Sequence, residues 1–403
     1  MRILALAPTS FFADYGCHVR IRGHLTALRA RGHTICLVTY PSGRDVDDLP
    51  IVRAPWPSAG PIQVGSSRLK LALDAALGPT ALVAALRFRP DVIHAYLHEG
   101  ALIGAVIAGL LRRPLIFDFQ GSLTGEMLDH RFISPRSPWL PLLRRLEGRL
   151  DRRPAAVLAS SAHAARLLAE QFGVPAARVA ALPDSVDPDH FRPADLFDPA
   201  ELATLRARLG IPAGVRLIVY LGLLAPYQGT DLLLEAMALL ARDSMPRFSG
   251  RRADVHLLLM GFPFVERYRG QAAASGLADR VTFTGAVPYE VAPIHLALGD
   301  VAVAPKLSAT EGSGKLLTYM AAGLPVVAFD TAVHREYLGE WGVYAAAGDA
   351  GALAGALADV LDRPQEAAAR GRALRAKAFD YTWEAAAAQI EAVYRSLGAS
   401  IDV

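Results

Sequence analysis

One loop in the second half of the chain holds the residues best suited to phosphate chemistry. Its members are Glu311, Gly312, Ser313, Gly314 and Lys315. A β-type run, 301–304, precedes the loop, and a helical segment, 315–322, follows it. The N-terminus of a helix offers unpaired N–H groups and a partial positive charge, which favour a phosphate. The pattern predicts a diphosphate site to which Lys315 adds a full charge. An ordinary strand–helix turn, in which glycines are common, is the alternative.

Length and composition indicate two globular domains. The 403 residues exceed the usual size of one core, and 52% of them are hydrophobic. Lysine and arginine total 42 against 39 acidic residues, a balance that gives no case for nucleic-acid binding. The two cysteines, Cys17 and Cys36, exclude a disulfide scaffold. We expect no metal site, because the acidic cluster at 45–48 is typical of a solvated turn.

No targeting segment is predicted. Residues 1–8 are typical of a buried strand, and the apolar run 101–111 is shorter than the roughly 20 residues that span a bilayer. We therefore expect a cytoplasmic protein. The segment 137–153 is amphipathic, with Trp139 and four leucines on one face and arginines nearby. It predicts either a surface helix packed on its own domain or peripheral contact with the inner face of an anionic membrane.

Short β-type runs alternate with helical segments, a pattern that predicts parallel sheets covered by helices. The predicted strands of the first half are 2–7, 34–39, 91–96, 115–119, 156–159 and 179–182. Those of the second half are 217–221, 255–260, 281–284, 301–304, 326–329 and 343–345. The pattern restarts near Leu217, after the polar stretch 183–212, so we expect two doubly wound domains. Ligands of such sheets bind beyond the carboxyl ends of the strands.

Several segments together resemble the retaining family 4 glycosyltransferases. They are LPDSVDPDHFRP at 182–193, YLGLLAPYQGTDLLLEAMALL at 220–240, RVTFTGAV at 280–287 and LTYMAAGLPVVAFD at 317–330. The resemblance implies the α/β GT-B fold, with two doubly wound Rossmann-like domains. It implies an acceptor-side domain over residues 1–195 and a nucleotide-sugar donor domain over 196–380. A C-terminal helix, 381–403, would pack back on the first domain.

The resemblance is broken where the family binds its donor phosphates. The family has an Arg and a Lys at positions that are Leu223 and Gln228 in this chain, and its second glutamate falls on Thr318. Two accounts fit these losses. In the first, which we prefer, Lys315 replaces the missing cations in an active enzyme. In the second, the chain is a degenerate relative that binds a ligand or partner without catalysis.

The resemblance and the loop positions together give a set of candidate residues. We assign catalytic roles to Glu311, Lys315, His98 and Gln120, and a structural role for His98 stays open. The donor-binding candidates are Gly222, Tyr227, Gln228, Gly261, Phe262, Gly285, Val287, Gly312, Ser313, Gly314 and Thr318. The acceptor-side candidates are Tyr15, Gly16, His18, Arg20, Ser122 and Glu126. Asp118, within an apolar strand, needs a polar partner if it is buried.

The resemblance implies retaining transfer of a sugar from a nucleotide-diphosphate donor to a glycan, a lipid-linked sugar or a small molecule. It implies no cofactor and no metal. The alternatives are a nucleotide-sugar epimerase or hydrolase on the same fold, and a nonenzymatic binding subunit. The base, the sugar and the acceptor are not readable from the side chains.

Overall fold

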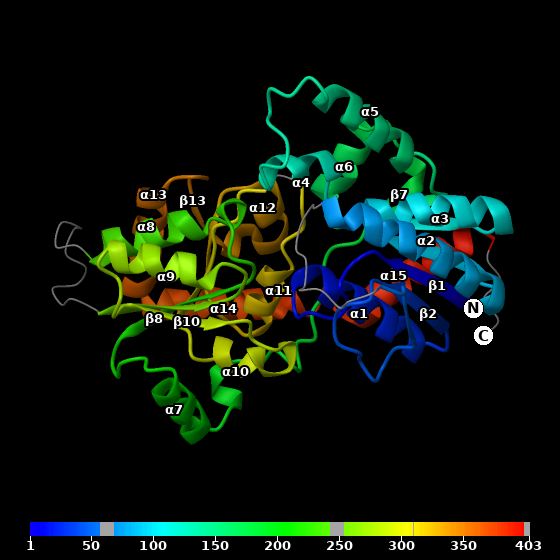
Figure 1. The fold of residues 1–403 in the computed structure, drawn as a ribbon. Coiled ribbons are helices and arrows are strands. Elements are labelled where there is room, and N and C mark those ends of the chain that lie inside the picture. Colours follow the sequence, from blue (N-terminus) through cyan, green and yellow to red (C-terminus); the bar gives the residue numbers. More distant parts are fainter. Residues whose placement is uncertain (57–67, 242–253, 309, 399–403) are drawn as a thin grey trace.

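The computed structural model describes residues 1–56, 68–241, 254–308 and 310–398. It shows two α/β domains side by side, each with a parallel sheet at its centre and helices on both faces (Figure 1).

The first domain contains a seven-stranded sheet. Its strands are β1 (Arg2–Ala7), β2 (Thr34–Thr39), β3 (Ile51–Arg53), β4 (Val92–Tyr96), β5 (Leu115–Phe119), β6 (Ala156–Ala159) and β7 (Val179–Ala181). Their order is β3-β2-β1-β4-β5-β6-β7, and all pairs are parallel. Sequence analysis missed β3, because three residues at a sheet edge are too short to show a period. The direction of winding changes between β1 and β4, where ligands of such sheets bind.

Alternate residues of β1 pack into the cores on the two faces of the sheet, which explains why this strand is apolar throughout. Leu4 and Leu6 belong to the core on one face of the sheet, and Ile3 and Ala5 belong to the core on the other.

The helices that cover this sheet are α1 (Gly16–Ala30), α2 (Arg68–Phe88), α3 (Leu97–Leu111), α4 (Leu123–Asp129), α5 (Leu140–Asp151) and α6 (Ala162–Glu170).

The second domain contains a six-stranded parallel sheet. Its strands are β8 (Arg216–Leu221), β9 (Val255–Met260), β10 (Val281–Gly285), β11 (Val301–Ala304), β12 (Val326–Phe329) and β13 (Val343–Ala345), in the order β10-β9-β8-β11-β12-β13. Its helices are α7 (Pro199–Arg208), α8 (Thr230–Ala241), α9 (Val265–Ala274), α10 (Ala292–Leu296), α11 (Gly314–Ala321), α12 (Ala332–Leu338), α13 (Ala350–Asp362) and α14 (Pro364–Ala378). Helix α11 is the predicted helix after the glycine loop and begins one residue earlier than expected.

The last helix, α15 (Trp383–Ser396), returns to the first domain and packs against α1 (Figure 1). Its buried residues Ala387, Ile390 and Tyr394 belong to the core of that domain. The Tyr394 hydroxyl lies 2.6 Å from Nδ1 of His94 in β4. The structure therefore confirms the expected fold class, including the returning helix.

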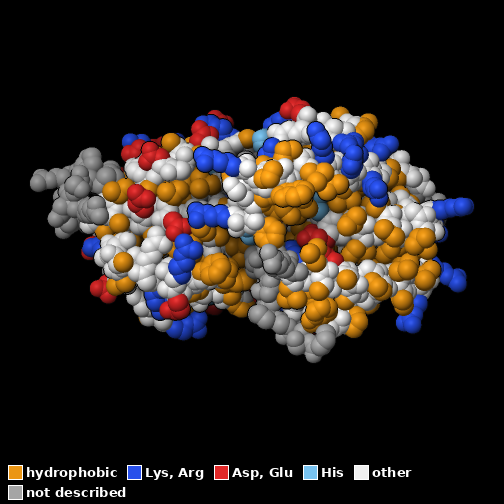
Figure 2. Space-filling model, turned by 45° about the horizontal axis from the view of Figure 1, so that its top comes forward, with side chains coloured by type: hydrophobic (Ala, Val, Ile, Leu, Met, Phe, Trp, Pro, Cys, Tyr) orange, Lys and Arg blue, Asp and Glu red, His pale blue; other side chains and the backbone are white. Residues whose placement is uncertain are grey.

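Three helices of the first domain leave large apolar side chains in solvent. The exposed residues are Leu69, Leu71, Val83 and Leu86 in α2, Leu102, Val106 and Leu110 in α3, and Trp139, Leu142 and Leu146 beside or in α5. Figure 2 shows hydrophobic side chains gathered over this half of the molecule, with Lys and Arg side chains beside them. By length and composition alone, residues 69–88 could also cross a membrane, and 28% of the most apolar window in this helix is buried.

Candidate functional site

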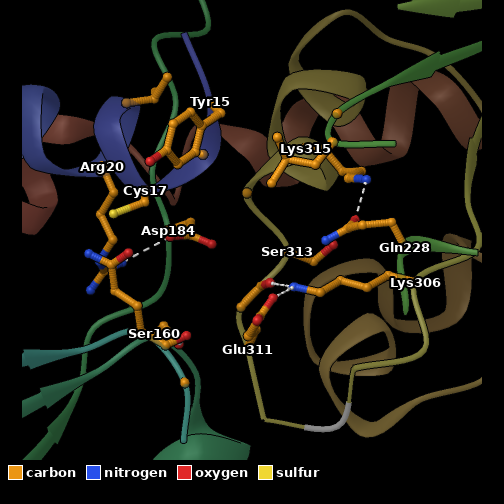
Figure 3. A pocket seen from close by; sticks show the side chains of 18 of the residues that line it. Tyr15, Cys17, Arg20, Ser160, Asp184, Gln228, Lys306, Glu311, Ser313 and Lys315 are labelled. Atoms are coloured by element: carbon orange, nitrogen blue, oxygen red, sulfur yellow. Dashed lines mark hydrogen bonds and ion pairs between the residues drawn. The ribbon is translucent and has the colours of Figure 1, made fainter. Parts of the chain in front are cut away.

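A cavity of about 290 Å³ lies between the two domains. Loops that follow β1, β4 and β5 line it from the first domain, and loops that follow β8, β9 and β11 line it from the second. Figure 3 shows side chains of both domains facing each other across it. The cavity lies at the carboxyl ends of both sheets, where doubly wound folds bind their ligands.

The N-terminus of α11 opens into this cavity. Ser313, directly before the helix, is buried, and its Oγ has no hydrogen-bond partner. The neighbouring glycines are required by close packing across the interdomain boundary. A Cβ at Gly312 would lie 2.7 Å from Oδ2 of Asp184, and one at Gly314 would lie 3.3 Å from it. The loop therefore brings backbone amides and an unpaired hydroxyl to one wall of the cavity, as a phosphate site needs.

Lys315 lies in the first turn of α11 and points to the loop after β8 (Figure 3). Its ammonium donates to Oε1 of Gln228 at 2.8 Å and to the Tyr220 hydroxyl at 3.0 Å. Gly222 allows this approach, because a Cβ there would lie 2.6 Å from Nζ. The single ammonium thus lies beside Leu223 and Gln228, the two positions at which sequence analysis found the expected cations missing.

Burial lowers the pKa of Lys315 well below its ordinary value, and the nearby Lys306 lowers it further. Glu311 acts in the opposite direction. The ammonium is held by two neutral groups, Gln228 and Tyr220, so its charge is poorly compensated. A bound anion would stabilise the charged form of this lysine.

Lys306 is a second cation at the site, and sequence analysis did not select it. It follows β11, its ammonium lies 2.7 Å from Oε2 of Glu311, and it donates to the Gly312 carbonyl at 2.6 Å (Figure 3). A compositional signal could have found it. Only four of the 42 basic residues are lysines, and three of them, Lys70, Lys306 and Lys315, line this cavity.

Glu311, the predicted sugar-binding carboxylate, lies at the boundary between the domains. Lys306 holds one of its oxygens, and its Cγ lies close to Gly121, where a Cβ would approach it to 2.7 Å. Gln120, just before that glycine, also lines the cavity, and its Nε2 has no hydrogen-bond partner. The carboxylate and the free amide group are both available for hydroxyl groups of a sugar.

Arg20, a predicted acceptor-side residue, lines the cavity but directs its guanidinium to partners within the first domain. It is 2% exposed and forms hydrogen bonds with both oxygens of Asp118, with Oδ1 of Asp184 and with the Leu182 carbonyl. Asp118 thereby has the partner that burial demands. Arg20 instead positions Asp184, whose other oxygen packs against the α11 loop.

The cavity brings together most of the predicted residues, with two exceptions. The predicted residues that line it are Tyr15, Gly16, Arg20, His98, Gln120, Ser122, Glu126, Gly222, Tyr227, Gln228, Gly261, Phe262, Val287, Glu311, Gly312, Ser313, Gly314, Lys315 and Thr318. His18 does not, because its Nε2 lies 2.6 Å from the Thr9 hydroxyl and its Nδ1 accepts from the Ala13 amide. Gly285 does not either, since its carbonyl accepts from the Gly261 amide behind the wall of the cavity.

Two further predicted residues have partners that sequence analysis did not foresee. The Thr318 hydroxyl donates to the Lys315 carbonyl one turn earlier, at 2.8 Å, while the residue still lines the cavity. His98 directs its Nε2 toward Glu147 and Asp151 of α5, at 3.5 and 3.4 Å. The imidazole therefore faces a buried acidic pair rather than a reacting group.

The acceptor side of the cavity carries a mixed set of charges. Lys70 lies 3.5 Å from Glu99, and burial is the main cause that raises the pKa of Glu126 above its ordinary value. Across the boundary, the ring of His130 lies 4.7 Å from that of Tyr227, centroid to centroid. Polar groups and one aromatic pair thus surround the space next to the proposed diphosphate site, an arrangement that suits a sugar.

Comparison with known proteins decides the family. The model for glycosyl transferases group 1 matches residues 215–363, and the model for the glycosyl transferase 4-like domain matches residues 15–184. Together they cover every strand of the two sheets except β1, and most of the residues that line the cavity. The chain is a GT-B glycosyltransferase of the family 4 type.

Individual relatives agree with this assignment. The GDP-mannose-dependent alpha-(1-6)-phosphatidylinositol monomannoside mannosyltransferase of Mycolicibacterium smegmatis is 32% identical over 62% of this chain, and the match spans 65% of that relative's length. The phosphatidyl-myo-inositol mannosyltransferase of Mycobacterium leprae is 28% identical over 99% of this chain and 98% of its own.

Among solved structures, HepE of Anabaena in complex with UDP superposes with a TM-score of 0.75 at 19% identity, covering 98% of this chain and all of that one. At that identity the likeness shows the fold. The expected fold, the family and the glycosyltransferase class of this chain are thus confirmed.

Proposed function

We propose that this chain transfers a sugar from a nucleoside-diphosphate sugar to a hydroxyl group of its acceptor. The bond between the sugar C1 and the diphosphate oxygen breaks, and a bond between C1 and the acceptor oxygen forms. The diphosphate leaves with the electron pair of the broken bond, and the acceptor hydroxyl gives its proton to this leaving anion. One observation carries this proposal: the buried ammonium of Lys315 and the N-terminus of α11 meet in the interdomain cavity.

The leaving diphosphate needs positive charge in place before the bond breaks. Lys315 and the amides of the α11 N-terminus supply it from one side, and the Ser313 hydroxyl offers a further donor. Lys306 keeps Glu311 and the glycine loop in position. We propose that these groups act on the diphosphate in place of a metal ion. Retention of configuration is proposed from the family resemblance.

Glu311 and Gln120 are placed to bind the transferred sugar, because both line the cavity next to the loop that holds the phosphates. The acceptor would enter from the side of Tyr15, Ser122 and Glu126. Two relatives named for phosphatidylinositol acceptors support a polyol or a lipid-linked polyol as the acceptor class.

A panel of nucleoside-diphosphate sugars, with released diphosphate as the readout, tests the proposal. Release that requires an added acceptor, with the sugar recovered on it, supports a transferase. Release without acceptor identifies a hydrolase, and conversion of the sugar without release identifies an epimerase. Tight donor binding with no turnover in any combination would establish the degenerate binding subunit instead.

We further propose that the first domain docks on an anionic membrane at its inner, cytoplasmic face. Trp139 and Leu146 are 66% and 48% exposed, although α5 packs on its domain through Leu140 and Gly148. Exposed apolar side chains with arginines beside them, as at Arg144 and Arg145, are the pattern of an interfacial helix.

Sedimentation with vesicles tests the membrane proposal. The wild-type chain should sediment with vesicles that contain phosphatidylglycerol more than with phosphatidylcholine alone. Replacing Trp139 and Leu146 by Ser should reduce that binding, whereas replacing Leu196, which is 54% exposed on the second domain, should leave it unchanged. Equal binding to both vesicle types would reject the proposal.

A further inference from the structure

Three metal-ligating side chains are buried together beneath α5. Glu147 and Asp151 lie one turn apart on this helix, and His98 lies in the first turn of α3. They are 3%, 0% and 6% exposed. His98 Nε2 is 3.5 Å from Oε1 of Glu147 and 3.4 Å from Oδ1 of Asp151, and one ligand atom from each residue lies within 4.8 Å of the others.

Hydrogen bonds leave half of this cluster unpaired. Glu147 accepts from the Leu123 amide at 2.7 Å, from the Thr124 amide at 3.0 Å and from the Thr124 hydroxyl at 2.5 Å. Both oxygens of Asp151, and Nε2 of His98, have no hydrogen-bond partner. A fully buried carboxylate without a partner is costly, so the fold must satisfy it in another way.

The spacing argues for an ion between the side chains rather than a direct contact. A charged N–H···O hydrogen bond would close to about 2.7–2.9 Å. Two ligands on a tetrahedral zinc ion, each bonded at about 2.0–2.1 Å, lie roughly 3.3 Å apart. The distances of 3.4 and 3.5 Å from Nε2 match the second geometry.

The balance of charges also favours a metal ion between these three side chains. A histidinium ion would neutralise one of the two carboxylates and leave a net negative charge in the interior. A divalent cation with a neutral imidazole neutralises both. We propose that His98, Glu147 and Asp151 bind one divalent metal ion, and that Zn²⁺ suits this set of one nitrogen and two carboxylates best.

The ion would be structural and separate from the diphosphate chemistry. It would tie α5 to the start of α3 and, through Glu147, to the start of α4, and these helices pack together in the first domain (Figure 1). The same helix starts carry Glu99, Ser122 and Glu126, which line the acceptor side of the cavity. Metal binding would therefore hold the acceptor side of the cavity and helix α5 in a fixed arrangement.

Zinc uptake by the full chain tests this site. The chain is purified without a polyhistidine tag, stripped with a chelator, and titrated with Zn²⁺ alone against a chromophoric competitor. We expect one ion per chain. Asp151→Asn and His98→Gln should each weaken binding by about tenfold or more, by analogy with the cost of disturbing a metal site. Glu170→Gln, an exposed carboxylate on α6 of the same domain, should bind as the wild type does.

Co²⁺ and thermal unfolding give two further readouts. Co²⁺ bound to the wild-type chain should show the intense visible absorption of a tetrahedral site, which both ligand variants should lose. Zn²⁺ should raise the unfolding temperature of the wild type and of Glu170→Gln only. Failure of the wild type to take up one equivalent overturns the proposal even if a variant does not fold. Equal affinity in the wild type and both variants overturns it as well.

Discussion

Lys315 places a positive charge beside Gln228, one of the two positions at which the family's cations are absent. Replacing it with Met keeps much of the side-chain volume and removes the ammonium from Gln228 and Tyr220. We expect kcat to fall by about 10²- to 10³-fold, the usual effect of losing one preorganised group at a developing charge.

Steady-state kinetics on Lys315→Met, with circular dichroism to verify folding, measure this effect. Lys377→Met is the matched control, since Lys377 contacts the Glu336 carbonyl outside the cavity. If Lys315→Met retained wild-type kcat and donor KM, the ammonium would have no part in the reaction.

The lowered pKa of Lys315 predicts how donor binding responds to pH. Burial favours the neutral amine in the free enzyme, whereas a bound diphosphate favours the ammonium. Above the lowered pKa, binding must take up a proton, so affinity falls as pH rises, by up to about tenfold per pH unit. Donor KM measured from neutral to alkaline pH should rise in the wild type and stay flat in Lys315→Met. A flat wild-type profile would contradict the assignment.

At the scale of elements, one carboxylate of α15 adds charged contacts to the apolar packing of this helix on the first domain. Glu391 accepts from Arg31 at 2.8 Å twice and lies 2.9 Å from Nε2 of His33. The Arg31 hydrogen bond is the largest cause that lowers the pKa of Glu391, to about 2, although burial opposes it. A carboxyl with a depressed pKa stabilises the fold above its unfolded pKa, and this contribution is lost as pH falls from 4.5 toward 2.

Glu391→Gln should therefore destabilise the protein at neutral pH by about 1.5–3 kcal/mol. It should also remove part of the acid dependence of unfolding in that window. Denaturant unfolding at neutral and acidic pH measures both effects. Glu384→Gln, an exposed carboxylate on the same helix, should change neither. An unchanged acid profile in Glu391→Gln would show that this carboxylate does not anchor α15.

The sequence was most informative about the positions of the helices and strands. Short apolar runs such as β4 and β11, which alternate with helical segments, are typical of strands buried on both faces of a parallel sheet, and the family motifs indicated their order. The three-residue β3 gave no pattern, because only its pairing with β2 makes it a strand. Lys306 and the His98 partners were missed since a single polar residue does not reveal which distant side chain it meets. Arg20 was placed in the cavity but not recognised as the support of Asp184.

At the scale of the whole molecule, the two domains are joined by two adjacent chain crossings. The Val186 amide donates to the Tyr381 carbonyl at 2.8 Å, and Val186 pairs with Thr382. Charged side chains also cross the boundary, and Glu336 of the second domain accepts from the Ala162 and His163 amides of the first. Glu290 of the second domain reaches Arg22 and Arg44 of the first, at 3.2 and 3.0 Å.

These exposed ion pairs predict that the two domains are held closed weakly, and that added salt weakens this closure. Glu290→Gln should increase the mean radius of gyration in X-ray scattering and raise the donor KM by about fivefold or less, since each surface pair contributes about 0–1 kcal/mol. High salt should bring the wild type to the same values. Glu366→Gln, which loses a surface pair with Arg370 inside the second domain, is the control. Salt-independent scattering in the wild type would speak against this closure.

The scarcity of lysine has a practical consequence for labelling this protein. Amine-directed reagents react with the neutral form of a lysine, and the environment of Lys315 favours that form. The 38 arginines are inert to such reagents, and three of the four lysines line the cavity. A nucleoside diphosphate that shields one peptide from acylation would then map its own binding site by mass spectrometry, before any sugar or acceptor has been identified.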